Sequence, residues 1–269
     1  MSTTTYAVRD STTMLRRNLK HMQRYPSLTL MLIGQPVLFL LLFVYVFGGT
    51  MGAGLPGGPA DAGGAAGRAD YLAYISPAIL IITVASVALS TAIYIAKDAT
   101  EGIIDRFRTM PIAKASVLTG HVLAAMVQTA IATAVVLVIA VLLGYRPDAT
   151  LAQWLGALGV LALLALALTW LCVALGLAAG SVETASNSPM FLVLLPFVSS
   201  AFVPTESMPT GVAWFAEHQP FTPVIDTLRT LLAGGEPGAD LWWAIGWCVV
   251  ITALSYAWAR RLFATVRAG

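Results

Sequence analysis

Charged residues are scarce in this sequence. Only 10% of its 269 residues are Asp, Glu, Lys or Arg, whereas 58% are hydrophobic and the mean hydropathy is +0.81. A soluble domain usually contains about 25% charged residues. The deficit excludes an ordinary soluble globular protein and indicates a chain that is integral to a membrane.

The long apolar runs contain no Asp, Glu, Lys or Arg. Ion-coupled transporters usually carry a carboxylate near the middle of the bilayer, so ion coupling and intramembrane catalysis are both disfavoured. None of the three lysines follows a glycine, and no phosphate-binding loop of the Walker type is present. The scattered His21, His121 and His218 predict no metal site, and Cys172 and Cys248, within apolar runs, predict no disulfide.

Six apolar runs make up most of the chain. They cover residues 28–47, 72–96, 117–143, 151–179, 188–203 and 241–259. A membrane-spanning helix needs about 20 apolar residues, and five of the runs reach this length, whereas Pro189 and Pro196 interrupt the short fifth run. We therefore predict an all-α integral membrane protein, with one domain over residues 1–269 and six transmembrane helices.

The lysines and arginines are distributed unevenly between the two ends of the predicted spans. Twelve of the 15 lie in the N-terminal segment, in the loop after the second run and at the C-terminus, which six spans place on one side. The positive-inside rule makes this side cytoplasmic. We therefore expect a multi-pass protein with both termini in the cytoplasm. Arg outnumbers Lys twelve to three and Ala and Gly are abundant, which suggests a GC-rich bacterial genome, so the expected location is the bacterial inner (cell) membrane.

Two segments flank the first run. Residues 9–25 are basic and amphipathic, which is typical of a helix that lies at the membrane interface. A signal peptide is rejected because the following apolar run is too long. Residues 48–70 are rich in Gly, Ala and Pro and predict a flexible loop on the outer side.

The outer segment before the sixth run contains two short semi-apolar pieces within residues 212–232. Trp214 and Phe215 suit the membrane interface, and Asp226 and Arg229 are spaced i, i+3 on a polar side. The pattern fits either helices that re-enter the outer leaflet or an ordinary extracellular loop.

The loop at residues 96–114 holds the densest charge cluster between two apolar runs. Ile103, Phe107 and Met110 recur at helical spacing and predict a short helix over residues 98–110. Such a helix is suited to docking on a soluble partner, and the alternative is a solvated connector. The residues expected in this contact are Asp98, Glu101, Gly102, Ile103, Asp105, Arg106, Phe107 and Arg108.

Mildly polar residues occur inside the runs, and most are expected to form hydrogen bonds between helices. Some could line a path for an amphipathic or apolar solute. The candidates for this path are Gln35, Thr83, Ser86, Ser90 and Ser199, together with Phe191 and Phe197. Gly176 and Gly180 form a small-xxx-small pair, which permits close helix packing.

Two motifs carry a resemblance to a known family. The first follows the second run and reads Asp98-Ala-Thr-Glu101-Gly-Ile-Ile-Asp105-Arg106-Phe-Arg108-Thr-Met-Pro111-Ile. The second precedes the sixth run and reads Gln219-Pro-Phe-Thr-Pro223-Val-Ile-Asp226-Thr-Leu-Arg229. In these motifs, in length and in number of runs, the chain resembles the membrane subunits, or permeases, of ABC-2 type transporters, and most closely the daunorubicin-resistance-like drug exporters.

The resemblance implies the ABC-2 fold of type V exporters. It makes residues 9–25 the interface helix, residues 98–110 the coupling helix and residues 212–232 re-entrant helices. The expected partners are a separate nucleotide-binding (ATPase) subunit and a second permease copy or paralogue, with the substrate path near the contact of the two permeases. ATP and Mg²⁺ would bind to the ATPase subunit, and no cofactor is expected in this chain.

The resemblance further implies an ATP-driven exporter of small amphipathic molecules such as an antibiotic. One alternative is an exporter of a lipid or a lipid-linked glycan. Another is a non-transporting membrane scaffold or sensor that recruits a cytoplasmic protein through residues 97–114. The chain is not expected to be an enzyme by itself, and besides these proteins its partners would be the lipid bilayer and the small amphipathic substrate, with no nucleic acid.

Overall fold

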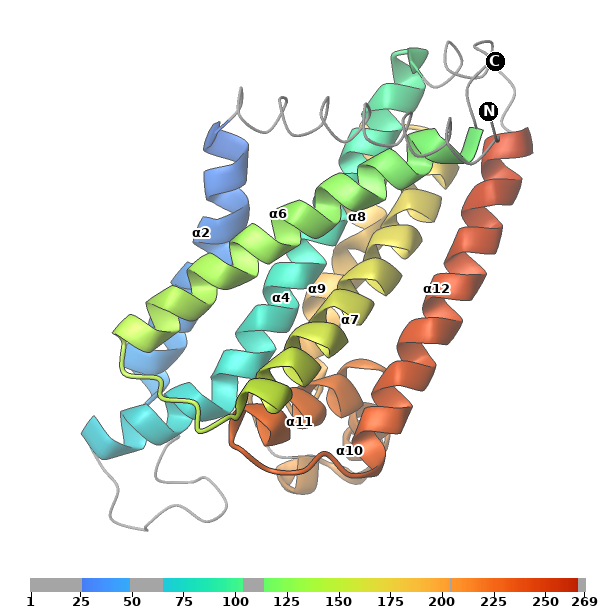
Figure 1. Cartoon of the computed structure of the whole chain (residues 1–269). Helices are drawn as coiled ribbons and strands as arrows, with labels where there is room; N and C mark the ends of the chain where they lie inside the picture. The colour runs from blue at the N-terminus through green and yellow to red at the C-terminus, as the bar shows by residue number, and fades with distance from the viewer. Residues whose placement is uncertain (1–25, 49–64, 104–113, 204, 266–269) are drawn as a thin grey trace.

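The computed structural model describes residues 26–48, 65–103, 114–203 and 205–265, which form helices and turns without a strand in these ranges. The predicted all-α class is therefore confirmed. Four helices in the described ranges are long and apolar enough to cross a membrane, and they run side by side in Figure 1. These are α4 (Ala65–Thr100), α6 (Lys114–Leu142), α7 (Leu151–Ala178) and α12 (Ala239–Thr265).

The first and fifth apolar runs form shorter pieces. Helix α2 (Pro26–Leu42) continues directly into the π-helical turn η1 (Phe43–Phe47). The fifth run divides near Pro189 and Pro196, since proline lacks the N–H of a continuous helix. Its pieces are η3 (Ser188–Met190), α9 (Phe191–Leu194) and η4 (Leu195–Val198), and the short helix α8 (Val182–Asn187) comes directly before it.

Helix α4 is longer than the predicted second span at both ends. Residues 65–70, predicted as part of a flexible loop, are helical, so this part of the prediction is wrong. The alanines there favour a helix, although Arg68 and Asp70 are charged. At 36 residues α4 is about 54 Å long, whereas the hydrocarbon core is about 30 Å thick, so the helix extends beyond the apolar layer.

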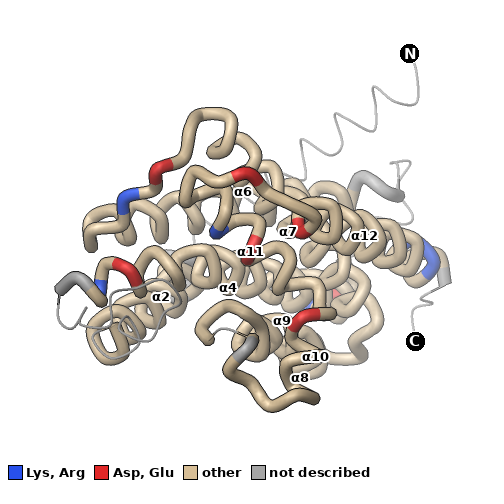
Figure 2. Tube along the Cα trace, turned by 90° about the horizontal axis from the view of Figure 1, so that it is seen from below, with Lys and Arg blue, Asp and Glu red and all other residues tan. Residues whose placement is uncertain are grey.

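Helix α4 also forms the centre of the bundle. It packs against α2, α6, α7 and α8, and 83% of its most apolar 18 residues are buried. Helix α12 is the opposite case, because it packs mainly on α7 and α11 and only 17% of its most apolar 18 residues are buried. The labelled part of α12 is tan in Figure 2, and blue Lys and Arg appear toward its C-terminal end. Trp242 and Trp243 near its start are exposed, as expected for a helix that faces lipid.

Helices α10 (Thr210–His218) and α11 (Phe221–Leu232) lie at the end of the bundle where α6 ends and α7 begins (Figure 1). Ile225 and Leu228 of α11 are fully buried against the bundle. A capping box between Thr150 and Gln153 starts α7, and the Gln153 amide donates to the Gly235 carbonyl at 2.9 Å, which joins this end of α7 to the turn after α11.

Candidate functional site

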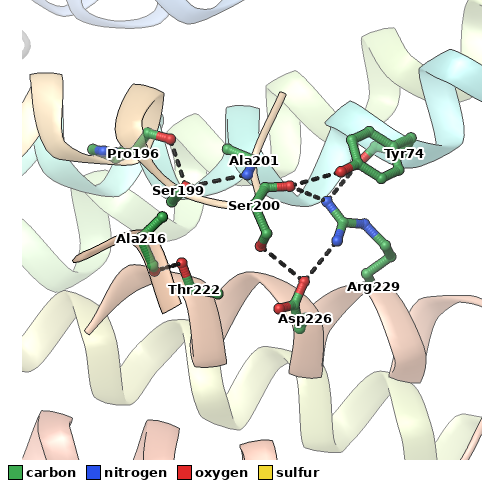
Figure 3. Close-up of polar contacts among 9 residues, drawn as sticks. All are labelled: Tyr74, Pro196, Ser199, Ser200, Ala201, Ala216, Thr222, Asp226 and Arg229. Carbon is green, nitrogen blue, oxygen red and sulfur yellow. Dashed lines mark hydrogen bonds and ion pairs between the residues drawn. The ribbon is translucent and has the colours of Figure 1, made fainter. Parts of the chain in front are cut away.

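A polar cluster joins α11 to α4 and to the turn after η4 (Figure 3). Nη1 of Arg229 donates to Oδ1 of Asp226 at 2.6 Å, and its Nη2 donates to the Ser200 carbonyl at 2.9 Å. The Ser200 hydroxyl donates to the same Asp226 oxygen at 2.9 Å, and the Tyr74 hydroxyl donates to the Ser200 carbonyl at 2.9 Å. Three segments far apart in sequence are thus tied at one point.

The charges of this cluster are partly removed from solvent. The side chains of Arg229 and Asp226 are 24% and 31% exposed, and the guanidinium lies 3.9 Å from the centroid of the Tyr74 ring. Burial raises the pKa of Asp226, while the Arg229 charge and the Ser200 hydroxyl act to lower it. The i, i+3 spacing was predicted, but the polar side of α11 faces protein groups of α4 instead of solvent.

Three further hydrogen bonds stabilise the same end of the bundle. The buried Ser199 hydroxyl donates to the Pro196 carbonyl at 2.6 Å and accepts from the Ala201 N–H at 3.1 Å. The Thr222 hydroxyl donates to the Ala216 carbonyl and links α11 to α10. Trp214 and Phe215 of α10 are exposed, and their place at the membrane interface stays a prediction. The cluster therefore anchors the two short helices to the long ones.

A second pair of titratable groups lies at the opposite end of α4. Oδ2 of Asp98 is 3.3 Å from Nε2 of His121, and both residues are only 8% exposed. Asp98 belongs to the last turn of α4 and His121 to α6, so this contact joins the two helices on either side of residues 101–113. Asp98 was expected to contact a partner, but in this structure it is not on an exposed face.

The described part of the predicted coupling helix differs from the prediction in where it begins. Residues 98–100 continue α4, which ends at Thr100, and a turn with Gly102 at φ +69° follows. Glu101 is exposed and lies 3.9 Å from Lys97, while Ile103 is half-buried. The other predicted contact residues, Asp105, Arg106, Phe107 and Arg108, lie outside the described residues, as does the interface helix at 9–25.

The predicted path residues of α4 do not line an open passage in this structure. Thr83, Ser86 and Ser90 are buried, and each hydroxyl donates to a backbone carbonyl of its own helix. This bonding pattern is the common one for serine and threonine in apolar helices, where no water can satisfy the hydroxyl.

The remaining path residues belong to α2, α9, η4 and the turn after η4. Gln35 of α2 and Phe191 of α9 are exposed, whereas Phe197 stacks on Phe202 at 4.8 Å and meets the ring of Phe39 edge-on at 5.8 Å. These aromatic contacts join α2 to η4 and the turn after it. Ser199 is buried in the turn described above, so only Gln35 and Phe191 are open to a solute.

Comparison with known sequences decides the family. The profile of the family described as ABC-2 type transporter matches residues 10–233, which is most of the chain. The chain belongs to the ABC-2 type transporter family. This confirms the resemblance found in the two motifs and confirms a membrane protein, and membership of this family implies an ABC ATPase as partner.

Two relatives of the chain carry names that mention drug resistance. The ABC-2 chain is 28% identical over 249 residues to the daunorubicin resistance ABC transporter permease protein DrrB1 of Streptomyces coeruleorubidus, covering 92% of this chain and 82% of the relative. It is 27% identical over 163 residues to the probable doxorubicin resistance ABC transporter permease protein DrrC of Mycobacterium tuberculosis, covering 59% of each chain.

Proposed function

We propose that this ABC-2 protein is the permease subunit of an ATP-driven exporter that moves amphipathic small molecules out of the bacterial cell. The observation that carries the proposal is the similarity to a daunorubicin resistance permease over 92% of this chain and 82% of that protein. The sequence has no Walker-type phosphate loop, which supports binding of ATP and Mg²⁺ by a separate subunit.

The proposed permease crosses the bilayer six times. The four long helices supply four crossings, and the shorter apolar segments 32–47 and 182–198 supply the others. In Figure 1 these six segments alternate in direction through the bundle. With both termini in the cytoplasm, as the lysines and arginines favour, α10 and α11 belong to the outer leaflet as re-entrant helices, and residues 9–25 to the inner interface.

Coupling to the ATPase subunit is assigned to residues 98–110. ATP binding closes the ATPase subunits, and Glu101, Asp105, Arg106 and Arg108 supply the polar contacts that transmit this movement, with Ile103 and Phe107 seated in a groove. Helix α4 supports this assignment, since it leads from the coupling segment into the centre of the bundle and contacts most other helices. A shift at its cytoplasmic end would therefore reach the whole core.

The face of α2 is proposed to meet a second permease copy, with the substrate path alongside. Gln35 is exposed in the middle of an apolar helix, and an amide is unfavourable against lipid tails. A partner chain or a passing solute would supply the missing hydrogen bonds. The exposed Phe191 of α9 offers an apolar contact for the same solute.

The test is transport by the purified complex. The chain would be co-expressed with its ATPase subunit, reconstituted in proteoliposomes and assayed for ATP-dependent movement of daunorubicin, with a hydrolysis-deficient ATPase subunit as control. Movement that requires ATP supports a drug exporter. A complex that moves a labelled lipid but does not move daunorubicin would be a lipid exporter. A chain that purifies without any ATPase subunit would be a scaffold.

Coupling is tested in the same system by charge reversal. Asp105→Arg or Arg106→Glu should lower daunorubicin-stimulated ATPase activity, since each polar contact contributes about 1 kcal/mol and reversal adds repulsion. A reversal at Glu217 of α10, far along the chain, serves as control. Unchanged stimulation in both coupling variants would remove residues 98–110 from the coupling role while leaving the transport proposal intact.

A further inference from the structure

A groove of about 330 Å³ lies between α7 and α12. Leu163, Leu166 and Trp170 form its α7 side, and the α12 side includes Thr252, Ala253 and Tyr256. The Thr252 hydroxyl donates to the Cys248 carbonyl of its own helix at 2.7 Å, so it adds little polarity to the lining. The lining of the groove is therefore almost entirely apolar.

The groove is open to the outside of the bundle. Ala253 and Val249 on its α12 side are exposed, and α12 is the least buried of the four long helices. Trp170 and Tyr256 both line the groove, and their rings meet edge to face with centroids 4.8 Å apart. In a membrane this opening faces lipid tails.

A positive charge lies beyond Tyr256 along α12. Arg260 follows Tyr256 by one helical turn, is exposed, and has its guanidinium carbon 5.6 Å from the centre of the Tyr256 ring. Among the described residues, no carboxylate lies within ion-pair distance of Arg260. The apolar run of α12 ends at Ala259, so Arg260 is also where the helix leaves the hydrocarbon layer.

The distance along α12 from the groove to Arg260 matches the thickness of one lipid leaflet. Val249 and Tyr256 of the groove are about 10 Å apart along the helix, and Arg260 is about 6 Å further on. Half of the hydrocarbon core is about 15 Å thick. An acyl chain in the groove would therefore reach a phosphate group at the level of Arg260.

We propose that the groove between α7 and α12 binds an acyl chain of an anionic phospholipid whose phosphate group is held by Arg260. A basic site between transmembrane helices at the membrane boundary suits an anionic head group. The guanidinium charge disfavours a cationic amphipathic drug in the same groove. The proposal rests on the membrane location of the chain and does not depend on what is exported.

The experiment measures lipid binding to the purified complex of this chain with its ATPase subunit. Delipidated complex in detergent is titrated with phosphatidylglycerol or phosphatidylcholine of identical acyl chains, and bound lipids are counted by native mass spectrometry. Ala253→Phe fills the groove, and Ala257→Phe places the same ring on an exposed position of α12 outside the lining. Arg260→Gln removes the charge, and Arg261→Gln is its neighbouring control.

One phosphatidylglycerol per chain should bind in preference to phosphatidylcholine. Arg260→Gln should weaken this binding about fivefold, and Arg261→Gln should weaken it less. Ala253→Phe should abolish the bound lipid, and Ala257→Phe should retain it. Equal binding of the two lipids, or equal effects of a variant and its control, would overturn the proposal. Loss of self-association in Ala253→Phe with an unchanged lipid count would overturn it too, since a second copy would then cover the groove.

Discussion

Replacement of Gly176 by alanine is expected to destabilise the protein through the contact between α7 and α4. A Cβ at this position would lie 2.6 Å from the Ala92 carbonyl oxygen, 3.0 Å from the Ala92 Cα and 3.1 Å from the Ile95 Cβ. The two nearest atoms belong to the backbone of α4, which cannot move as a flexible side chain does. Glycine is therefore required here by the close approach of two helices.

The size of the effect follows from this geometry. Ordinary van der Waals contact begins near 3.4 Å. The added methyl group, 2.6 Å from the Ala92 oxygen, must therefore move about 0.8 Å away from it. Overpacking of a tight core costs about 1–3 kcal/mol. Gly159 is a matched control in the same helix, because its added Cβ would meet nothing within 4 Å. Alanine there should be neutral or stabilising by about 0.5–1 kcal/mol.

The assay is thermal unfolding of the purified chain in one detergent at one heating rate, because irreversible unfolding makes the midpoint depend on that rate. The two variants should differ in stability by about 1–4 kcal/mol, so Gly176→Ala should have the lower Tm. Gly180→Ala, also without a neighbour within 4 Å, should resemble the wild type. Equal Tm values for Gly176→Ala and Gly159→Ala would refute the close packing of α4 on α7.

Three further predictions concern the polar contacts and the turn after α4. Arg229→Ala leaves Asp226 partly buried without its ion pair and should lower stability by about 1–3 kcal/mol. The double variant with Asp226→Ala should lose less stability than the two single variants added together, and thermal unfolding of all three variants measures this coupling. His121→Ala removes a partner from the buried Asp98 and should cost about 1–3 kcal/mol in the same assay, and a wild-type Tm would count against the pair. Gly102→Ala strains the backbone at φ +69° by about 1 kcal/mol. This variant should lower drug-stimulated ATPase activity more than Gly102→Asn, because asparagine tolerates the conformation. Equal activities of the two variants would contradict the strain argument.

Much of the fold class could be predicted from local properties of the sequence. Apolar length identifies a transmembrane helix because the bilayer has a fixed thickness, and an uneven distribution of Lys and Arg orients it. The family could likewise be recognised from two short motifs, and the profile match over residues 10–233 confirmed it. Span ends were less accurate, since α4 continues well past its apolar run at both ends. Helix formation needs only favourable propensity there, whereas the prediction followed hydropathy.

The contacts of individual side chains depended on the tertiary structure. Gly176 and Gly180 were equivalent in the sequence pattern, yet only Gly176 faces the backbone of another helix. Asp98 was read as part of an exposed docking face, and His121 as isolated, because no spacing rule links residues on different helices. No such rule relates Arg229 to Tyr74 either.

The sequence by itself therefore determined the class of protein, its family and the approximate positions of its four long apolar helices. Hydropathy and charge act over the length of a helix and can be read along one chain. Only the tertiary structure decided that α4 is the central helix, that α11 is tied to it through Arg229, and that α12 stands at the edge with a groove beside it. Those outcomes depend on which face of each helix meets a neighbour, and in an all-round apolar helix no periodicity marks that face.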